Sequence, residues 1–314
     1  SIFAFSAFNK CIKIKPDFLI GTTSRLMTGV LTWISAKFLR RKYYIDLRDI
    51  FSETISDLFA LKSGFLSTIF GYFFSYLDKK VLNSASGVNV VSEGFYEYFE
   101  KNGINTSNWS FFPNGVDEEF LDFPTSIKLP SKVVKTILYA GNIGTGQGLD
   151  LVIPEISKRL GPNYRFIIIG DGGAISLLRA AIQSEGINNV EILPPMDRSK
   201  LIKYYLDADI MFLHLNDIPA FQRVLPSKIF EYTALRKPIV AGLKGYSSQF
   251  VRDNIPYACL FSPGDVNGAI SCILDANNSS VSQVALNNFV MKYSRVTIMN
   301  KMSNELINIM EHNK

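Results

Sequence analysis

The sequence predicts an α/β protein with two domains, each built on a doubly wound parallel sheet. Its 314 residues are enough for two domains of ordinary size, each with its own hydrophobic core. Short apolar runs of strand type alternate with helical segments in both halves of the chain, and this alternation is typical of parallel sheets covered by helices. Between the halves, residues 121–132 contain prolines and serines without a clear hydrophobic period, so we place an interdomain linker there.

The N-terminal domain, residues 1–120, is expected to start with an apolar helix over residues 1–15. Ser24 is a suitable N-cap for the helix that follows the first strand. The dipeptide Asn114-Gly115 indicates a tight turn that closes this half of the chain. Strands are expected at Phe18–Gly21, Tyr43–Leu47, Gly87–Val91 and Trp109–Phe112, and further helices at residues 23–41, 65–82 and 94–101.

The C-terminal domain, residues 133–292, resumes the alternation with a strand at Thr136–Ala140 and a helix from Leu149. Three helical patterns follow the last strand, and the final one covers Val296–Glu311. The remaining strands are expected within residues 165–173 and 188–194, and at Ala208–Leu215, Pro238–Ala241 and Tyr257–Phe261.

One stretch, residues 223–242, carries the strongest indication of a binding site. Pro226 and Ser227 mark the start of a short helix that joins two strands of an open parallel sheet, and ligands bind beyond the carboxyl ends of such strands. Lys228, in the first turn, opposes the helix macrodipole, and an anion would neutralise it. Glu231 can accept hydrogen bonds from a diol. These residues suit a sugar nucleotide, although solvated surface charges remain an equally open alternative.

The loop GNIGTGQG, Gly141–Gly148, lies between a strand and a helix. Its glycines would allow the backbone to approach phosphate groups closely. The spacing differs from the dinucleotide-binding fingerprint, so the alternative of a plain tight turn stays open. His214 lies at the end of a buried strand near this loop, where a histidine is more often a core residue than a ligand.

The distribution of positive charge indicates a membrane surface as a partner. The net charge is only +5 with a pI near 8.9, which argues against nucleic acid. The basic residues Arg40–Lys42 and Lys79–Lys80 each follow an apolar helix. Aromatic residues within 65–76 would lie at the interface and the lysines would contact anionic lipid. The alternative is a buried core helix, because a helix that is apolar all round is usually buried.

The cysteines and the apolar runs bear on the compartment. Cys11, Cys259 and Cys272 are odd in number and unclustered, so neither a disulfide framework nor a zinc site is expected. No signal peptide and no uncharged run of membrane-spanning length is visible. We therefore expect a cytoplasmic protein, peripheral on the inner face of the plasma membrane, without a metal site.

Several motifs together resemble one enzyme family. The block PSK, two apolar residues and then Glu231-Tyr232 is similar to the donor-site signature of the group 1 (family 4) retaining GT-B glycosyltransferases, especially the O-antigen and capsule branch. The segments IDLRDIF, NVVSEGF and PNGVD occur in the family's order and spacing, so the resemblance covers essentially the whole chain. It implies two Rossmann-like domains facing across a cleft, with residues 293–314 packing back on the N-terminal domain. It also implies that the first strands of the N-terminal domain lie before Ser1, so that this domain is truncated.

The resemblance also implies roles for individual residues of the donor site. Glu231 would bind the ribose of the donor nucleotide, and Lys228 with the helix start at Pro226 and Ser227 would bind its diphosphate. Met196 would lie at the edge of the nucleobase. In the glycine-rich loop, Asn142 and Gln147 stand where the wider family has an Arg and a Lys, beside Gly141 and Gly144. Arg223 stands where the wider family has a Glu that contacts the donor sugar.

The catalytic assignment comes from the same resemblance. Arg48 and Asp49 stand where the family often has a His near the anomeric carbon. Arg48 would steady the phosphate or the acceptor, and Asp49 would take the acceptor proton. A purely structural Arg48–Asp49 ion pair is the alternative, because charged pairs at strand ends are often structural.

The function implied is transfer of a sugar, with retention, from a nucleoside-diphosphate sugar to a lipid-linked saccharide in cell-surface polysaccharide synthesis. The expected donor is a UDP-sugar. No cofactor and no metal are expected, because helix N–H groups and Lys228 can stabilise the diphosphate. A catalytically silent GT-B binding or scaffold subunit is the main alternative. A sugar-nucleotide epimerase is a weaker one, because it would need acid–base carboxylates and histidines that the sequence does not show.

Overall fold

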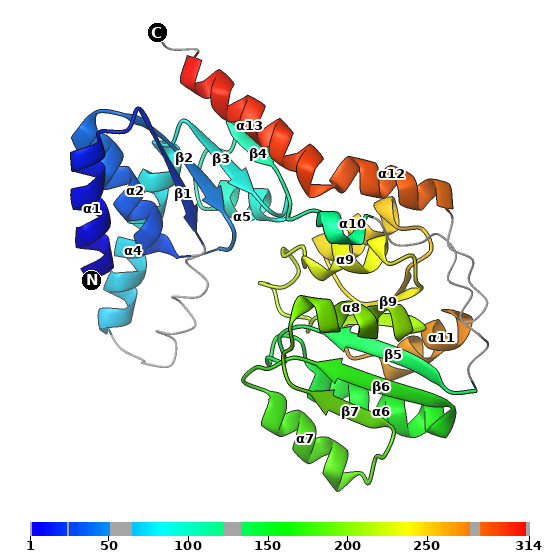
Figure 1. Ribbon diagram of the computed structural model, residues 1–314. Coiled ribbons are helices and arrows are strands. Elements are labelled where there is room, and N and C mark those ends of the chain that lie inside the picture. The colour runs from blue at the N-terminus through cyan, green and yellow to red at the C-terminus, as the bar shows by residue number, and fades with distance from the viewer. Residues whose placement is uncertain (1, 24, 51–64, 122–132, 277–282, 312–314) are drawn as a thin grey trace. The chain divides into compact units, whose positions relative to one another are not determined.

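The computed structural model describes residues 2–23, 25–50, 65–121, 133–276 and 283–311 (Figure 1). The chain divides into two compact units, residues 1–113 with 298–314, and residues 114–297. Residues 114–120 therefore group with the second unit. The linker placed at 121–132 lies, apart from Leu121, outside the described residues, and so does the expected cap Ser24.

The first unit holds a sheet whose described strands are all parallel, in the order β1-β2-β3-β4. Residues 43–47 and 87–90 of its two central strands are fully buried, because helices cover both faces. The strands are β1 Phe18–Thr23, β2 Lys42–Leu47, β3 Gly87–Val90 and β4 Trp109–Phe111. The helices are α1 Ile2–Ile14, α2 Leu26–Leu39, α4 Phe65–Asn83, α5 Phe95–Lys101 and α13 Arg295–Glu311, the last of which begins in the second unit.

Helix α13 is fastened to the first unit's sheet by polar contacts. The hydroxyl groups of Tyr44 and Ser110 donate to the two carboxylate oxygens of Glu305, at 2.9 and 2.5 Å. The Lys42 ammonium donates to the carbonyl oxygen of Ile309 at 2.8 Å. Since these partners are about 200 residues or more apart in sequence, the C-terminal helix completes a unit that the N-terminal segment begins.

The second unit holds a sheet in the order β10-β9-β8-β5-β6-β7, again parallel at every described pairing. The chain runs outward from β5 to β7 and then returns to the other side of β5, where Ile137 pairs with Ile210. The sheet therefore has a topological switch point between β5 and β8. The strands are β5 Lys135–Ala140, β6 Tyr164–Ile169, β7 Val190–Leu193, β8 Ile210–His214, β9 Ile239–Gly242 and β10 Cys259–Phe261.

Helices pack on both faces of this six-stranded sheet (Figure 1). They are α6 Leu149–Leu160, α7 Ile175–Ser184, α8 Arg198–Asp207, α9 Lys228–Ala234, α10 Tyr246–Asn254, α11 Val266–Ala276 and α12 Gln283–Tyr293, with short 3-10 turns at Glu118–Phe120 and Gly161–Asn163. Phe230 of α9 is fully buried, and its ring centroid lies 5.6–5.9 Å from those of Phe250, Phe289 and Tyr293. Helix α9 is thereby fixed by an aromatic cluster on the side away from its polar residues.

One expectation about the cysteines is wrong. Cys259 of β10 and Cys272 of α11 form a disulfide, with their Cα atoms 5.5 Å apart, whereas Cys11 is free. The cause is tertiary, because the helix that follows β10 packs back beside that strand and brings together two residues 13 positions apart. Within the described part of the chain, no cluster of His, Cys, Asp and Glu is suited to a metal ion. No helix found there is long and apolar enough to cross a bilayer.

Candidate functional site

A pocket of about 340 Å³ opens at the switch point of the second unit's sheet. The loops that follow β5, β6 and β7 and the start of α9 surround it, as expected for the carboxyl ends of parallel strands. Four predicted site residues line it, Gly141, Asn142, Met196 and Lys228. Its other lining residues are Ala140, Ile169, Gly170, Asp171, Pro195 and Leu201. The structure thus brings together residues 87 positions apart in sequence.

The glycine-rich loop is held by its own polar side chains. The Gln147 side-chain oxygen accepts hydrogen bonds from the Asn142 amide at 2.9 Å and from the Gly144 N–H at 3.0 Å. The two side chains that stand in the predicted diphosphate positions therefore contact each other across the loop. Since Asn142 lines the pocket, its amide can donate to an anion once it leaves Gln147.

Close packing explains why this loop needs glycine. A side chain at Gly146 would collide with the ring of Phe221, and one at Gly148 with the side chain of Asn216. Gly148 also has φ +56°, a left-handed conformation that residues with a Cβ adopt at a cost. The N–H of Asn216 donates to the Gly146 carbonyl at 2.9 Å. The loop after β8 thus fixes the loop after β5.

Lys228 and Glu231 face each other on the first turn of α9. The Lys228 ammonium donates to a carboxylate oxygen of Glu231 at 2.8 Å, and both side chains are mostly buried. The Lys228 side chain also lies against Gly141, with its Cε 3.8 Å from the place where a Cβ would stand. A cation and a carboxylate therefore meet beside the glycine-rich loop.

The start of α9 differs from the expected cap. Ser227 occupies the N-cap position but has helical backbone angles, and its side chain makes no capping hydrogen bond. The carbonyl oxygens of Pro226 and Ser227 instead accept from the N–H groups of Ile229 and Phe230, both at 3.1 Å. The Ser227 side chain is exposed and remains available to a ligand.

Tyr205 is a site residue that sequence reasoning missed. Its hydroxyl donates to the same Glu231 oxygen at 3.1 Å and accepts from Lys228 at 3.2 Å. The buried ring of Tyr205 lies 6.0 Å from the ring of Phe120. The Arg198 guanidinium covers the Phe120 ring and pairs with Asp117. No local signal in α8 marks Tyr205, because only the packing of α8 against α9 gives its hydroxyl a role.

His214 is a structural residue. Its Nδ1–H donates to the carbonyl oxygen of Gln147 at 2.6 Å, since a carbonyl can only accept, and its Nε2 accepts from the Gly264 N–H at 3.0 Å. The ring is fully buried and stacks on Phe261. Burial lowers the pKa of His214 below its ordinary 6.5, although the hydrogen bond to Gln147 acts in the opposite direction. The neutral imidazole thereby joins the glycine-rich loop to the turn after β10.

The titration of His214 predicts a loss of stability in mild acid. Between the lowered folded-state pKa and 6.5, the unfolded chain binds a proton that the folded chain does not, so the unfolding free energy falls as pH decreases through this window. The slope should reach about 1.4 kcal/mol per pH unit. Urea unfolding of the second unit at several pH values measures it. His214→Asn should remove this slope, and His312→Gln, at the C-terminus, should keep it. An unchanged slope in His214→Asn would contradict the assignment.

The predicted catalytic residues follow β2 in the first unit. Arg48 pairs with Asp46, through Nε at 2.9 Å and Nη2 at 2.8 Å. Alternate residues of an extended segment point to the same side, which brings the Arg48 side chain to that of Asp46. Asn89 donates to the other oxygen of the buried Asp46 at 2.7 Å. The exposed Asp49 carboxylate accepts from the Ile50 N–H at 2.8 Å.

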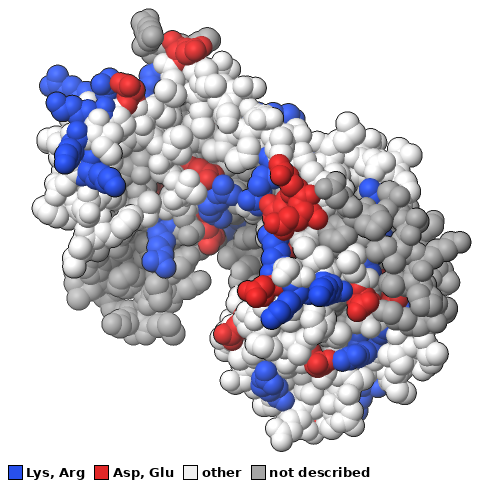
Figure 2. Space-filling model, in the orientation of Figure 1, with Lys and Arg blue, Asp and Glu red and all other residues white. Residues whose placement is uncertain are grey.

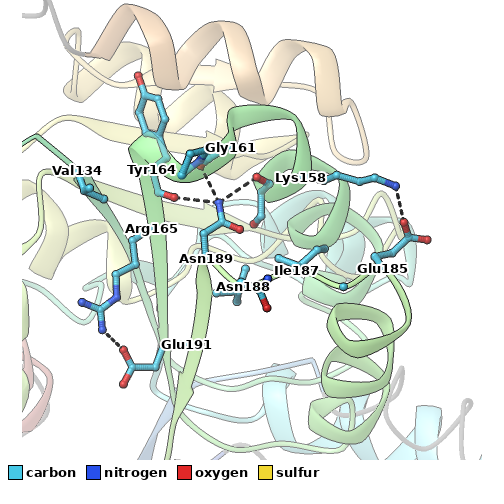
Figure 3. Close-up of a pocket in the computed structure, with 14 residues that line it drawn as sticks. Val134, Lys158, Gly161, Tyr164, Arg165, Glu185, Ile187, Asn188, Asn189 and Glu191 are labelled. Atoms are coloured by element: carbon cyan, nitrogen blue, oxygen red, sulfur yellow. Dashed lines mark hydrogen bonds and ion pairs between the residues drawn. The ribbon is translucent and has the colours of Figure 1, made fainter.

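A larger pocket of about 620 Å³ lies at the opposite, amino end of the second unit's strands (Figure 3). The Asn189 amide donates to the carbonyl oxygens of Ser157, Gly161 and Tyr164 at 2.9–3.0 Å and so ties this end together. The charged residues that line this pocket pair with one another, Arg165 with Glu191 and Lys158 with Glu185. Because it is remote from the switch point, this pocket is not the site of the predicted chemistry.

The second unit matches a known family by sequence. Residues 126–280 match the profile of the family described as "Glycosyl transferases group 1". The chain is 24% identical over 242 residues to WcaI of Escherichia coli (strain K12), which is provisionally described as a colanic acid biosynthesis glycosyl transferase. That alignment covers 74% of this chain and 59% of WcaI, so the chain spans less than two thirds of this curated relative.

The fold matches solved structures over almost the whole chain. Anabaena Alr3699/HepE, solved in complex with UDP and glucose, is similar with a TM-score of 0.75 at 18% identity, over 98% of this chain and 81% of that one. The sucrose-phosphate synthase tll1590 from Thermosynechococcus elongatus has a TM-score of 0.74 at 15% identity, over 97% of this chain and 77% of that one. The expected α/β GT-B fold, with two parallel Rossmann-like sheets of which the N-terminal is smaller, is confirmed.

Proposed function

We propose that this chain, whose residues 126–280 match the group 1 glycosyltransferase profile, transfers a sugar from a nucleoside-diphosphate sugar to a saccharide acceptor with retention of configuration. One observation carries the proposal. Lys228 and Glu231 meet beside the glycine-rich loop at the switch point of the sheet, where nucleotides bind in open α/β folds. A UDP-sugar is the proposed donor, and the structural likeness to Alr3699/HepE, which was solved with UDP, supports it.

The leaving diphosphate determines the chemistry that the second unit must supply. Negative charge grows on the diphosphate as the glycosidic bond breaks, so a fixed positive group nearby lowers the barrier. We assign this role to Lys228 together with the Asn142 amide, both of which line the pocket. Since these donors can stabilise the charge themselves, we propose that the reaction proceeds without a metal or other cofactor.

The two ends of the nucleoside would be held separately. Glu231 would accept hydrogen bonds from the ribose hydroxyls, and Tyr205, bonded to the same carboxylate, is the positioning residue that fixes its orientation. Met196, which lines the far side of the pocket, would contact the edge of the base. Donor binding then frees Lys228 from Glu231, because the ribose and the phosphate take the two partners.

In the first unit we propose that Arg48 and Asp49 act on the acceptor side. The Asp46 and Asn89 contacts hold Arg48 at the carboxyl end of β2, so its guanidinium is preorganised. Asp49 is exposed beside it and can accept the proton that the acceptor hydroxyl loses when it attacks the anomeric carbon.

For the acceptor we propose a lipid-linked saccharide in surface polysaccharide synthesis, handled on the cytoplasmic side of the membrane. The likeness to WcaI supports the pathway class. Peripheral membrane contact is supported by large apolar side chains that the first unit exposes on helices, Phe3 and Phe5 of α1 and Tyr72, Phe73 and Tyr76 of α4, each more than half exposed. The exposed aromatics of α4 favour the interfacial interpretation of that helix over a fully buried one.

Substitution of Glu231 tests the donor site. Glu231→Ala removes the acceptor of charge-assisted hydrogen bonds, so UDP-sugar affinity in calorimetry should fall by about 1.5–3 kcal/mol. Tyr205→Phe should cause a smaller loss, because the carboxylate stays but its orientation is released. Glu155→Ala, an exposed carboxylate on α6, is the matched control and should bind like the native chain. Unchanged affinity in Glu231→Ala would remove this residue from the site.

A binding subunit without turnover is the second candidate function. Arg223, which stands where the wider family has a sugar-contacting Glu, favours it. The two candidates differ in one measurement. A screen of UDP-sugars against a lipid-diphosphate saccharide, read by mass spectrometry, should show a product one sugar heavier for a transferase. Donor binding with no product under any condition would favour the binding subunit.

A further inference from the structure

The first unit has a pocket of about 520 Å³ at the amino end of its sheet. The last turn of α2, the loop that leads into β2 and the last turn of α4 form it. Half of the ten lining residues that the structure describes are cations, Lys37, Arg40, Arg41, Lys42 and Lys80, and none of these ten is an Asp or Glu. Figure 2 shows Lys and Arg gathered at the end of this unit where α1 and α2 terminate. A pocket lined by charge of one sign creates a positive potential that attracts anions.

Among the described residues, few of these cations are neutralised by an acidic side chain. Arg41 pairs with the exposed Asp17 at 3.3 Å, and Lys42 donates to a backbone carbonyl of α13. Lys37 and Lys80 lie over the rings of Trp33 and Tyr76, with the ammonium groups 5.5 and 5.6 Å from the ring centroids. These ring contacts orient the side chains without cancelling their charge.

Helix dipoles do not account for the cluster. Two helices, α2 and α4, end at the pocket, and each C-terminus carries roughly half a negative charge. The N–H groups of Arg40 and Arg41 already bond the carbonyl oxygens of Lys37 and Ala36. About one negative charge from the two helix ends, together with the Asp17 carboxylate, therefore faces five cations, so a positive surplus remains.

Exposed apolar side chains lie in the same helices as the cations. Phe38, between Lys37 and Arg40, is 63% exposed, and Ile34, one turn earlier, is 44% exposed. The Phe38 ring packs at 5.5 Å against that of Phe8, so it is held at the surface rather than drawn into the core. Cations with apolar neighbours at one surface match a bilayer, where phosphate groups lie above acyl chains.

We propose that this pocket binds the phosphate headgroup of an anionic phospholipid. The pocket lies at the first residue of β2, Lys42, whereas the proposed acceptor residues follow the last residue of β2, Leu47. At the rise of a β-strand, these ends are separated by roughly 17 Å. The bound lipid is therefore an anchor distinct from the acceptor. The inference rests on the proposed membrane association and names the lipid class and the residues that recognise it.

Vesicle flotation tests the proposal. The full chain should float with phosphatidylcholine vesicles that contain phosphatidylglycerol and remain in the lower fractions with phosphatidylcholine alone. Replacing Lys37, Arg40 and Lys80 together with Gln should weaken binding to the anionic vesicles on the order of 100-fold at low ionic strength, since each cation near the surface contributes about fivefold. The loss should shrink at high salt, because screening weakens the native interaction.

A charge-matched variant separates the pocket from overall charge. Replacing Arg179, Lys200 and Lys203, exposed residues of the second unit, with Gln removes the same three charges and should leave flotation nearly unchanged. Equal losses of vesicle binding in the two variants would contradict the assignment of lipid binding to this pocket. Titration of inorganic phosphate into the native chain and into the pocket variant distinguishes a lipid headgroup from free phosphate as the ligand. Phosphate binding that depends on the pocket, without flotation, would overturn the lipid assignment.

UDP binding, measured by calorimetry on the same samples, keeps the two proposals separate. The pocket variant should bind UDP as the native chain does, which shows that it is folded. Pocket-dependent flotation by a chain that binds no UDP would refute the donor function and leave this inference intact. A chain that binds UDP but floats with neither kind of vesicle would refute the lipid pocket and leave the donor function intact.

Discussion

Replacing Lys228 with methionine is expected to lower kcat for sugar transfer on the order of 10²–10³-fold, because in the proposed reaction this residue is the cation that stabilises the leaving diphosphate. Glu231 and Tyr205 hold the Lys228 ammonium, and the Lys228 side chain lies against Gly141, so the positive charge stands beside the pocket. Its attraction grows as charge develops in the transition state, and the loss should therefore fall mainly on kcat. Initial rates at saturating UDP-sugar measure it.

Two further variants control for side effects of this substitution. Lys228→Met leaves Glu231 without its cation, so the double variant with Glu231→Gln shows whether an unpaired carboxylate causes the loss. Lys228→Arg keeps the charge and should retain more activity than the methionine variant. A kcat for Lys228→Met within a factor of two of the native value would contradict the role assigned to this lysine.

Phe230→Ala should lower the unfolding free energy of the second unit by about 3–5 kcal/mol, the usual range for a fully buried phenylalanine. The side chain has no exposed surface and contacts Phe250, Phe289 and Tyr293, which come from α10 and α12. Its loss leaves a cavity behind the helix that carries Lys228 and Glu231. Donor affinity should fall as well, because the helix loses its support.

The two tryptophans allow the units to be followed separately. Trp33 and Trp109 both lie in the first unit, so tryptophan fluorescence reports the first unit, whereas amide hydrogen exchange of β8, α9 and β9 reports the second. Phe230→Ala should reduce protection in those segments and shift the fluorescence transition much less. Val284→Ala, which removes a 71% exposed side chain of α12, should change neither. Equal effects of the two variants would contradict the packing argument.

The sequence by itself determined the alternation of strands and helices and indicated the residues of the proposed donor site. Parallel strands buried on both faces appear as continuous apolar runs such as Ile210–His214, and this local signal does not depend on the partner strands. The glycines of residues 141–148 and the first turn of α9 are also local features. These local features are sufficient to predict Lys228 as an anion ligand without knowledge of its surroundings.

Only the tertiary structure decided which residues meet. The strand order places β5 beside β8, and this pairing joins the glycine-rich loop to the loop that follows His214. Arg48 pairs with Asp46, two residues earlier, because strand geometry directs alternate side chains to one face. Hydrophobic period and capping preferences are properties of a segment, whereas a contact depends on how the chain crosses over. Tyr205 acquires its hydrogen bond to Glu231 in that way, since no neighbouring residue in α8 encodes the packing of α8 against α9.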